Sequence, residues 1–231
     1  MSVRPNGSQP RTPLTVALFG PPGSGKGTQA TFLVEHLHIG RVSTGELFRH
    51  EVRRGTGLGL QAKQYIEHGE LVPDAITLAM FRERLKKPDC ADGVLLDGFP
   101  RTAAQAEALN GILQGLGRRM DRVIYIRVPQ EVLISRLSGR LTCPTCGATY
   151  HPELAPPRRR GVCDRDGSEL FQRDDDAPET ALRRINVYKE QTVSVLDYYR
   201  EQGLAAEVDG LGPVEEVHRR ALASLSESVV G

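Results

Sequence analysis

The stretch GPPGSGKGT, residues 20–28, organises the chain around it. The apolar run 14–19 before it is typical of a buried strand, and residues 29–37 after it have the apolar spacing of an amphipathic helix. A glycine-rich loop between a strand and a helix predicts a P-loop, in which backbone N–H groups and the helix N-terminus hold phosphate. The residues predicted to surround the phosphates are Gly23, Ser24, Gly25, Lys26, Gly27 and Thr28.

One position in this loop departs from the usual P-loop pattern. Gly27 follows Lys26, where a Ser or Thr usually supplies a hydroxyl ligand to Mg²⁺, and Thr28 comes one residue later. Direct hydroxyl ligation from the residue after the lysine is therefore not available. Because a strand and a helix flank the loop, we prefer phosphate binding to the alternative of a plain glycine- and proline-rich turn.

Length and composition are those of a globular protein. The chain has 231 residues, 39% hydrophobic and 26% charged, with a formal net charge of +1. This balance gives no general attraction to nucleic acid or anionic membrane. No apolar run approaches the roughly 18 residues that span a bilayer, so we expect a cytoplasmic protein. Residues 1–13 are expected to form a disordered leader, and their prolines argue against the amphipathic helix of a transit peptide.

Strands alternate with helices along most of the chain, which predicts a parallel sheet covered on both faces. Glycines 55, 57 and 59 are expected to interrupt the helices of residues 43–72, and one long helix is expected over 178–201. Ligands of such sheets bind at the carboxyl ends of the strands, where the P-loop, Thr44, Asp97 and Arg101 fall. The further predicted strands end at Val42 or cover 94–97, 123–128 and 205–208.

Residues 141–177 contain two pairs of possible metal ligands. Cys143 and Cys146 form one C-x-x-C knuckle, and Cys163 and Asp166 form a second knuckle, separated from the first by sixteen residues. Three thiolates and one carboxylate predict a closed, structural Zn²⁺ site. Reduced or disulfide-paired cysteines are one alternative, and His151 as the fourth ligand is another.

Several arginines fall near predicted turns, which suits phosphoryl transfer, because this reaction depends on neutralising the negative charge of the transferred group. Asp97 ends a buried strand, where a carboxylate is costly unless it serves a cation or a hydrogen-bond network, so we expect it to hold a Mg²⁺-bound water. A cap on the next turn is the simpler interpretation of Asp97, and a solvated surface position is the simpler one for each arginine. The candidate arginines are Arg49, Arg101, Arg136, Arg140, Arg173, Arg183 and Arg184.

These motifs together resemble the adenylate kinase family, from about Leu14 to the C-terminus. The resemblance is carried by residues 20–28, the STGE stretch 43–46, the DGFPR stretch 97–101 and the two metal-ligand knuckles followed by Arg173. The cysteine-bearing segment is similar to the zinc lid of the long-lid bacterial type. The resemblance implies a three-layer α/β fold of the nucleoside monophosphate kinase type, with a parallel five-stranded sheet. It also implies a core over 14–231, a helical AMP-binding insertion over 43–72 and a small zinc-stapled β lid over 140–177.

The resemblance further implies that the enzyme moves the ATP γ-phosphoryl group to AMP, giving two ADP, with Mg²⁺ beside ATP. Groups implied in catalysis are Lys26, Asp97, Arg101, Arg136, Arg173 and Arg184. ATP is implied to lie against the P-loop with Arg136, Arg140, Tyr150 and His151. AMP is implied to lie against Thr44, Arg49, Leu71, Val72, Gly98, Phe99, Pro100, Arg101, Gln105, Arg173 and Arg184.

Other functions remain open at this point. A P-loop ATPase would consume ATP without AMP, and a related kinase would accept UMP or CMP. A nucleic-acid-binding zinc module would use the basic run 158–160, although the balanced charge and the 5% aromatic content argue against it. We expect ATP, AMP and ADP as partners, no nucleic acid or membrane, and a monomer.

Overall fold

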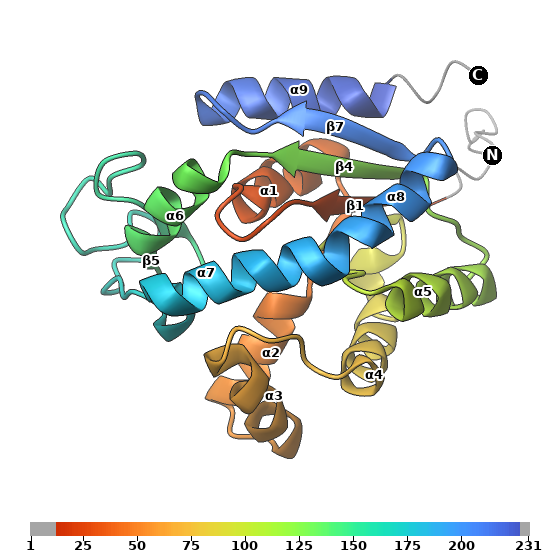
Figure 1. Cartoon of the computed structure of the whole chain (residues 1–231), viewed down its shortest axis with the longest axis horizontal. Helices are drawn as coiled ribbons and strands as arrows, with labels where there is room; N and C mark the ends of the chain where they lie inside the picture. The colour runs from red at the N-terminus through yellow and green to blue at the C-terminus, as the bar shows by residue number, and fades with distance from the viewer. Residues whose placement is uncertain (1–12, 227–231) are drawn as a thin grey trace, which may run out of the picture.

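Within residues 13–226, which the computed structural model describes, a five-stranded parallel sheet forms the centre of the molecule (Figure 1). The strand order is β2-β3-β1-β4-β7, and each neighbouring pair runs parallel. This confirms the predicted sheet, whereas residues 1–12 of the expected leader lie outside the described residues. The strands are β1 (Leu14–Phe19), β2 (Gly40–Ser43), β3 (Gly93–Asp97), β4 (Arg122–Arg127) and β7 (Ala205–Asp209).

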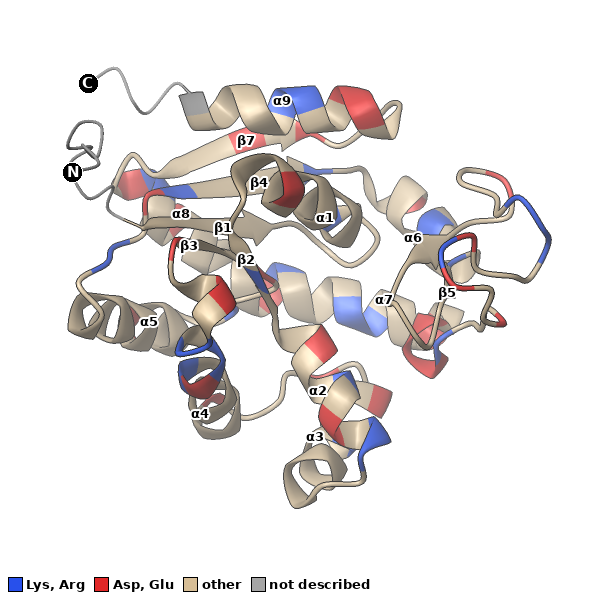
Figure 2. Cartoon of the chain, turned by 180° about the vertical axis from the view of Figure 1, so that it is seen from behind, with Lys and Arg blue, Asp and Glu red and all other residues tan. Residues whose placement is uncertain are grey.

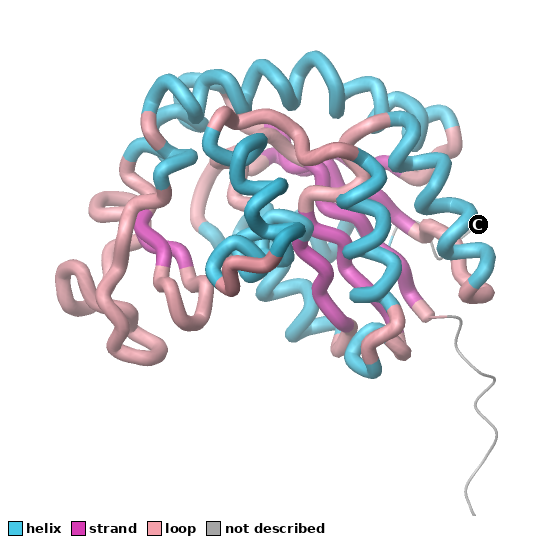
Figure 3. The backbone as a smooth tube through the Cα atoms, turned by 90° about the horizontal axis from the view of Figure 1, so that it is seen from below, coloured by secondary structure: helices cyan, strands magenta, loops and turns pink. Residues whose placement is uncertain are grey.

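Helices cover both faces of the sheet because the central strands are apolar on both sides (Figure 3). Ala17 and Phe19 of β1 pack into one buried cluster, and Val16 and Leu18 pack into the other, which is the period of two of a strand. Burying each large apolar side chain stabilises the fold by about 2 kcal/mol. The first cluster includes α4 (Asp74–Leu85), α5 (Ala103–Gly115) and α8 (Val193–Glu201). The second includes α1 (Lys26–Leu37), α6 (Gln130–Ser138), α7 (Pro178–Val187) and α9 (Val214–Ser226).

Helix α7 continues into α8, as the sequence predicted for residues 178–201. A π-helical turn, Tyr188–Thr192, joins them. This turn places Tyr188 on the wall of the cavity described below. Short 3₁₀ turns at Pro88–Cys90 and Asp174–Asp176 precede β3 and α7.

Two helices, α2 (Thr44–Arg53) and α3 (Gly57–Glu67), project from the sheet between β2 and α4 (Figure 1). Gly55 separates them at φ 64°. The expectation that Gly57 and Gly59 also interrupt a helix was wrong, because both lie inside α3. A Cβ on Gly59 would stand 2.2 Å from the Glu51 carbonyl oxygen, so glycine here allows α2 and α3 to pack closely.

The segment between α6 and α7 has little regular structure. It contains the antiparallel pair β5 (Leu141–Thr142) and β6 (Thr149–Tyr150), and Thr142 also bridges to Phe171. We call residues 141–171 the cysteine segment. Its buried apolar cluster consists of Cys143, Cys163 and Leu170. Figure 3 shows this segment to one side of the central sheet, as loops around a short pair of strands.

Candidate active site

A cavity of about 670 Å³ lies at the carboxyl ends of the strands, where ligands of parallel sheets bind. Its walls come from the P-loop, α2, the turn after β3, α6, the cysteine segment and α7. Charged residues gather on α2 and on the loops around β5 (Figure 2). The structure therefore brings distant predicted residues to one cavity: Lys26, Thr44, Arg49, Asp97, Arg101, Gln105, Arg136, Arg140, Arg173 and Arg184.

The P-loop requires glycine at Gly23 for two reasons. Its φ of 84° is in the left-handed region, which favours glycine. A Cβ at this position would also lie 2.8 Å from the Leu133 carbonyl oxygen on α6. The loop therefore packs against α6 while its backbone lines the cavity. Gly27 and Thr28 follow in the first turn of α1.

Lys26 begins α1, and its side chain folds back over the loop. Nζ donates hydrogen bonds to the carbonyl oxygens of Gly20 at 2.6 Å and Pro21 at 2.9 Å. Burial lowers the pKa of Lys26 to about 7, and the nearby Asp97 carboxylate opposes this shift. The Lys26 ammonium is therefore a charge that a phosphate group would stabilise.

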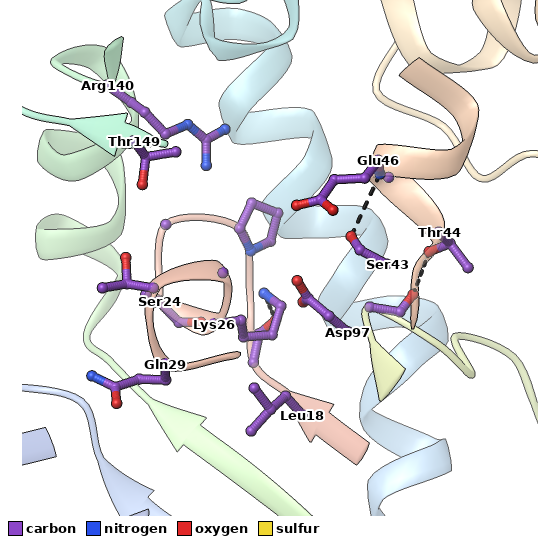
Figure 4. A pocket seen from close by; sticks show the side chains of 18 of the residues that line it. Leu18, Ser24, Lys26, Gln29, Ser43, Thr44, Glu46, Asp97, Arg140 and Thr149 are labelled. Atoms are coloured by element: carbon purple, nitrogen blue, oxygen red, sulfur yellow. Dashed lines mark hydrogen bonds between the residues drawn. The ribbon is translucent and has the colours of Figure 1, made fainter. Parts of the chain in front are cut away.

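Asp97, at the end of β3, faces Lys26 and Glu46 across the cavity floor (Figure 4). It accepts a 2.6 Å hydrogen bond from Arg41 Nη2, which also lies 3.0 Å from Glu46 Oε1. Burial by itself would raise the pKa of Asp97, but the Arg41 and Lys26 charges outweigh it and hold this pKa below its usual value. Asp97 is thus an ionised carboxylate beside the P-loop. The Asp97 carboxylate offers oxygen ligands that suit Mg²⁺ or its bound waters.

A network of hydrogen bonds organises the turn after β3. The Gly98 carbonyl oxygen accepts from Thr44 Oγ1 at 3.0 Å and from Arg101 Nε at 2.7 Å. The Gln105 amide is held at both ends, since Oε1 accepts from Arg101 N at 2.8 Å and Nε2 donates to Asp74 Oδ1 at 2.6 Å. Burial and the Arg184 charge lower the pKa of Arg101 to about 10, so its guanidinium stays charged at neutral pH.

Arg49, Leu71 and Val72 also line the cavity. Val72 packs with Phe48 of α2 in a small buried cluster, and its carbonyl oxygen accepts from Thr77 Oγ1 at 3.2 Å. Burial lowers the pKa of Arg49, and the Asp175 charge opposes the shift. An arginine on an apolar wall is suited to a ligand with a flat ring and an anionic group.

Acidic residues before α7 hold the arginines on the other side of the cavity. Asp176, with a fully buried side chain, pairs with Arg140 and accepts from Arg184 Nη1 at 3.0 Å. Asp175 lies 2.9 Å from the same Arg184 nitrogen. Arg173 Nε donates to Thr142 Oγ1 at 2.9 Å, and burial lowers the pKa of Arg173 to about 9. These contacts hold the guanidinium groups of Arg140, Arg173 and Arg184 beside the cavity.

Arg136 contacts a loop that the sequence did not single out. Its Nη2 donates to the Gly210 carbonyl oxygen at 3.1 Å, just after β7. Gln29 of α1 donates to the Val214 carbonyl oxygen at 3.0 Å, and these contacts fix residues 210–214 beside the P-loop. Gly210, Gly212, Pro213 and Val214 all line the cavity.

Tyr150 and His151 also line the cavity, but both have contacts within the protein. The Tyr150 hydroxyl lies 3.5 Å from Cys163 Sγ and accepts from Asp164 N at 2.9 Å. His151 Nε2 lies 3.3 Å from the Ser135 carbonyl oxygen on α6. His151 therefore connects the cysteine segment to α6.

The ligand atoms of Cys143, Cys146, Cys163 and Asp166 all lie within 4.8 Å of one another. The Cys146 and Cys163 sulfurs are 3.6 Å apart, and the four described cysteines are free thiols, which excludes the disulfide alternative in this structure. His151 is not part of the group. Three sulfurs and one carboxylate oxygen fit a tetrahedral metal site of the zinc type.

Comparisons with known proteins agree with this geometry. A sequence profile described as adenylate kinase matches residues 18–204. The chain belongs to the adenylate kinase family. It is 50% identical over 212 residues to an adenylate kinase of Salinispora tropica, covering 92% of this chain and 98% of that protein. It is 52% identical over 204 residues to an adenylate kinase of Carboxydothermus hydrogenoformans, covering 88% and 95%.

Family membership makes the protein a nucleotide-binding phosphotransferase. No helix within residues 13–226 is long and apolar enough to cross a membrane. Sequence reasoning missed two parts of the cavity lining, Arg41 paired with Glu46 and the 210–214 loop, and also Asp74, which holds the cavity residue Gln105. Their position in the sequence could have identified Arg41 and Gly210 as cavity residues. Arg41 lies near the end of β2 and Gly210 directly follows β7, both at the carboxyl edge of the sheet.

Proposed function

We propose that the protein transfers the γ-phosphoryl group of ATP to the phosphate of AMP, giving two ADP. The observation that carries this proposal is a single cavity with positive charge from separate parts of the chain. Lys26 comes from the P-loop, whereas Arg49 comes from α2 and Arg101 from the turn after β3. A hydrolase needs one anion site, whereas a transfer between two phosphorylated nucleotides needs two facing each other.

ATP is proposed to bind along the P-loop. The loop N–H groups and Lys26 hold its phosphates, and Arg136 borders the adenine side with the 210–214 loop. AMP is proposed to bind near α2, with its base by Gln105 and its phosphate by arginines. The proposed ATP residues are Gly23, Ser24, Gly25, Lys26, Gly27, Thr28, Arg136, Arg140, Tyr150 and His151. The proposed AMP residues are Thr44, Arg49, Leu71, Val72, Gly98, Phe99, Pro100, Arg101, Gln105, Arg173 and Arg184.

The transfer depends on positioning and charge, with no covalent intermediate on the enzyme. Lys26 neutralises charge on the donor side, while Arg101, Arg173 and Arg184 neutralise it on the acceptor side. Closure of residues 43–72 and 140–177 over the nucleotides excludes water, which would otherwise accept the phosphoryl group. The ion pairs of Arg140 and Arg184 with Asp175 and Asp176 orient these two guanidinium groups before the nucleotides arrive.

Two metals complete the proposal. Asp97 would hold the hydrated Mg²⁺ that accompanies ATP, and the ion would supply further charge neutralisation. Cys143, Cys146, Cys163 and Asp166 would hold Zn²⁺. Because four protein ligands leave no open coordination position, the zinc role is structural.

An assay with four acceptors tests the reaction. ADP formation from ATP and Mg²⁺ is measured with AMP, UMP, CMP or GMP, and without acceptor. We expect the highest kcat/KM with AMP and two ADP formed per ATP consumed. Fast ATP consumption without acceptor would indicate an ATPase, and a preference for another monophosphate would replace AMP in the proposal.

A further inference from the structure

Arg41 occupies a place in the cavity that the proposed reaction does not explain. Its Nη2 atom lies 2.6 Å from Asp97 Oδ2 and 3.0 Å from Glu46 Oε1, so one nitrogen serves two carboxylates. The side chains of Arg41 and Asp97 are 21% and 9% exposed, which shields this contact from most of the solvent. A buried carboxylate needs a cationic partner, and here the partner is the Arg41 guanidinium.

The guanidinium also stands against the P-loop. A Cβ built on Gly27 would lie 3.6 Å from Arg41 Nη2. Many P-loops carry a metal-binding hydroxyl at this position. The Arg41 charge therefore fills the space between the start of α1 and the two carboxylates, the same space that a cation held by Asp97 beside a triphosphate needs.

The hydrogen bonding of Arg41 in this place is incomplete. Its Nε is buried and has no hydrogen-bond partner among the described residues. An unsatisfied buried donor costs free energy, which weakens the preference for this arrangement. Glu46, whose side chain is 48% exposed, offers a second carboxylate already within reach of the same nitrogen. A short movement of the guanidinium would keep its charge paired while freeing Asp97.

We propose that Arg41 is a displaceable counter-ion of the magnesium site. Its guanidinium neutralises Asp97 while no cation is present, and it moves toward Glu46 when a divalent cation and ATP arrive. The inference rests on the proposed function, because it assumes that Asp97 serves that cation. The cation can bind only after the Arg41 guanidinium has moved away from Asp97. The apparent affinity for the cation is therefore lower than it would be if Asp97 were unpaired. Arg41 is therefore a positioning residue that sets the magnesium concentration at which the site fills.

The test measures metal affinity directly, with Mn²⁺ as the paramagnetic probe. Full-length enzyme is saturated with a non-hydrolysable imido analogue of ATP, and free Mn²⁺ is followed by electron paramagnetic resonance. We expect Arg41→Gln to tighten Mn²⁺ binding about tenfold, which is typical of removing one closely paired charge. Arg41→Lys should give a smaller gain, because an ammonium keeps the charge but has no planar fork. Arg200→Gln is the matched control, since Arg200 pairs with Asp197 and Glu207 outside the cavity.

Unchanged or weaker Mn²⁺ binding in the folded Arg41 variants would overturn the inference. If Arg41→Gln does not fold, Arg41→Lys carries the same decision. In an Asp97→Asn background, Arg41→Gln should have no effect on Mn²⁺ affinity, and a tenfold gain there would also overturn it. Failure of the proposed function gives a different result: the wild-type complex would then bind Mn²⁺ no better than the free analogue does.

Discussion

The sheet and the cysteine segment line the same cavity, but different interactions hold them together. The sheet has an apolar cluster on each face, with residues such as Leu95 and Leu96 fully buried. The cysteine segment has a cluster of three buried residues and four converging metal ligands. A segment with so small a core needs a cross-link. The comparison teaches that the sheet fixes the P-loop by packing, whereas the cysteine segment and the arginines beside it depend on candidate metal ligands and on ion pairs.

The largest expected effect is on turnover, and it tests whether Lys26 contributes its charge to catalysis without contributing to the stability of the fold. Lys26→Met should lower turnover about a thousandfold, because a preorganised charge on the phosphates is lost. The melting temperature should change little, since Nζ hydrogen-bonds loop carbonyl oxygens and Asp97 keeps Arg41 as its ion-pair partner. Steady-state kinetics and calorimetry measure both quantities.

Lys63→Met is the matched control for this substitution. Lys63 is exposed on α3 and forms an i,i+4 pair with Glu67, so its removal should leave turnover near the wild-type value. Turnover of folded Lys26→Met within about tenfold of wild type would contradict the role given to the P-loop lysine.

The next largest effect is on stability, and it compares the apolar core of the sheet with the small apolar cluster of the cysteine segment. Leu96→Ala should lower the free energy of unfolding by about 3 kcal/mol, because it opens a cavity in the packed sheet. Leu170→Ala removes the same atoms from the cluster of the cysteine segment and should lower global stability by less than about 1 kcal/mol. Denaturant unfolding measures both. Equal losses would show that the cysteine segment unfolds together with the sheet.

Metal removal should have a smaller effect on the whole chain and a strong one on the cysteine segment. A zinc chelator is expected to abolish amide protection in residues 141–171 while β1, β3 and β4 stay protected. The melting temperature should fall by about 2–4 °C for each kcal/mol lost. Metal analysis, hydrogen exchange and melting with and without the chelator check this.

Cys163→Ser is the internal control for chelation. It removes one of the four ligands, so the variant should already have an unprotected segment and should not respond further to the chelator. A metal-free wild-type protein with an unchanged melting curve and full amide protection in residues 141–171 would contradict the proposal that this segment, unlike the sheet, depends on a metal.

The sequence predicted those parts of the site that depend on local patterns. The P-loop glycines and the two ligand knuckles are read from neighbouring residues, because the backbone conformation or the ligand spacing is decided within a few positions. The sheet was also predictable, since apolar strands alternating with helices favour one parallel arrangement. Apolar burial and short motifs are therefore the reliable signals in this chain.

The parts that were missed depend on contacts between distant segments. Arg41 meets Asp97 across two strands, and Asp74 meets Gln105 between two helices. Gly59 was misread because its need for glycine comes from the Glu51 carbonyl of a neighbouring helix and not from a turn. Composition and periodicity carry no information on such pairs, since either partner alone is an ordinary polar residue.

The smallest expected effect compares how the charges on the two sides of the cavity titrate. Burial lowers the pKa of Lys26 to about 7, of Arg173 to about 9 and of Arg101 to about 10. At pH 8 the arginines are therefore charged in the free enzyme, while most Lys26 side chains are neutral. Phosphate oxygens stabilise the ammonium and raise the pKa of Lys26, so binding takes up a proton.

Calorimetry of the imido analogue of ATP in buffers with different ionisation enthalpies measures this uptake. We expect somewhat less than one proton per nucleotide at pH 8, and a smaller contribution from Lys26 below pH 7, where the free enzyme already carries that proton. Lys26→Met should remove the uptake at pH 8. Binding heats that do not depend on the buffer at pH 8 would mean that Lys26 keeps its proton in the free cavity. The sheet side would then be as permanently charged as the arginine side, and the two sides would differ only in how their charges are held.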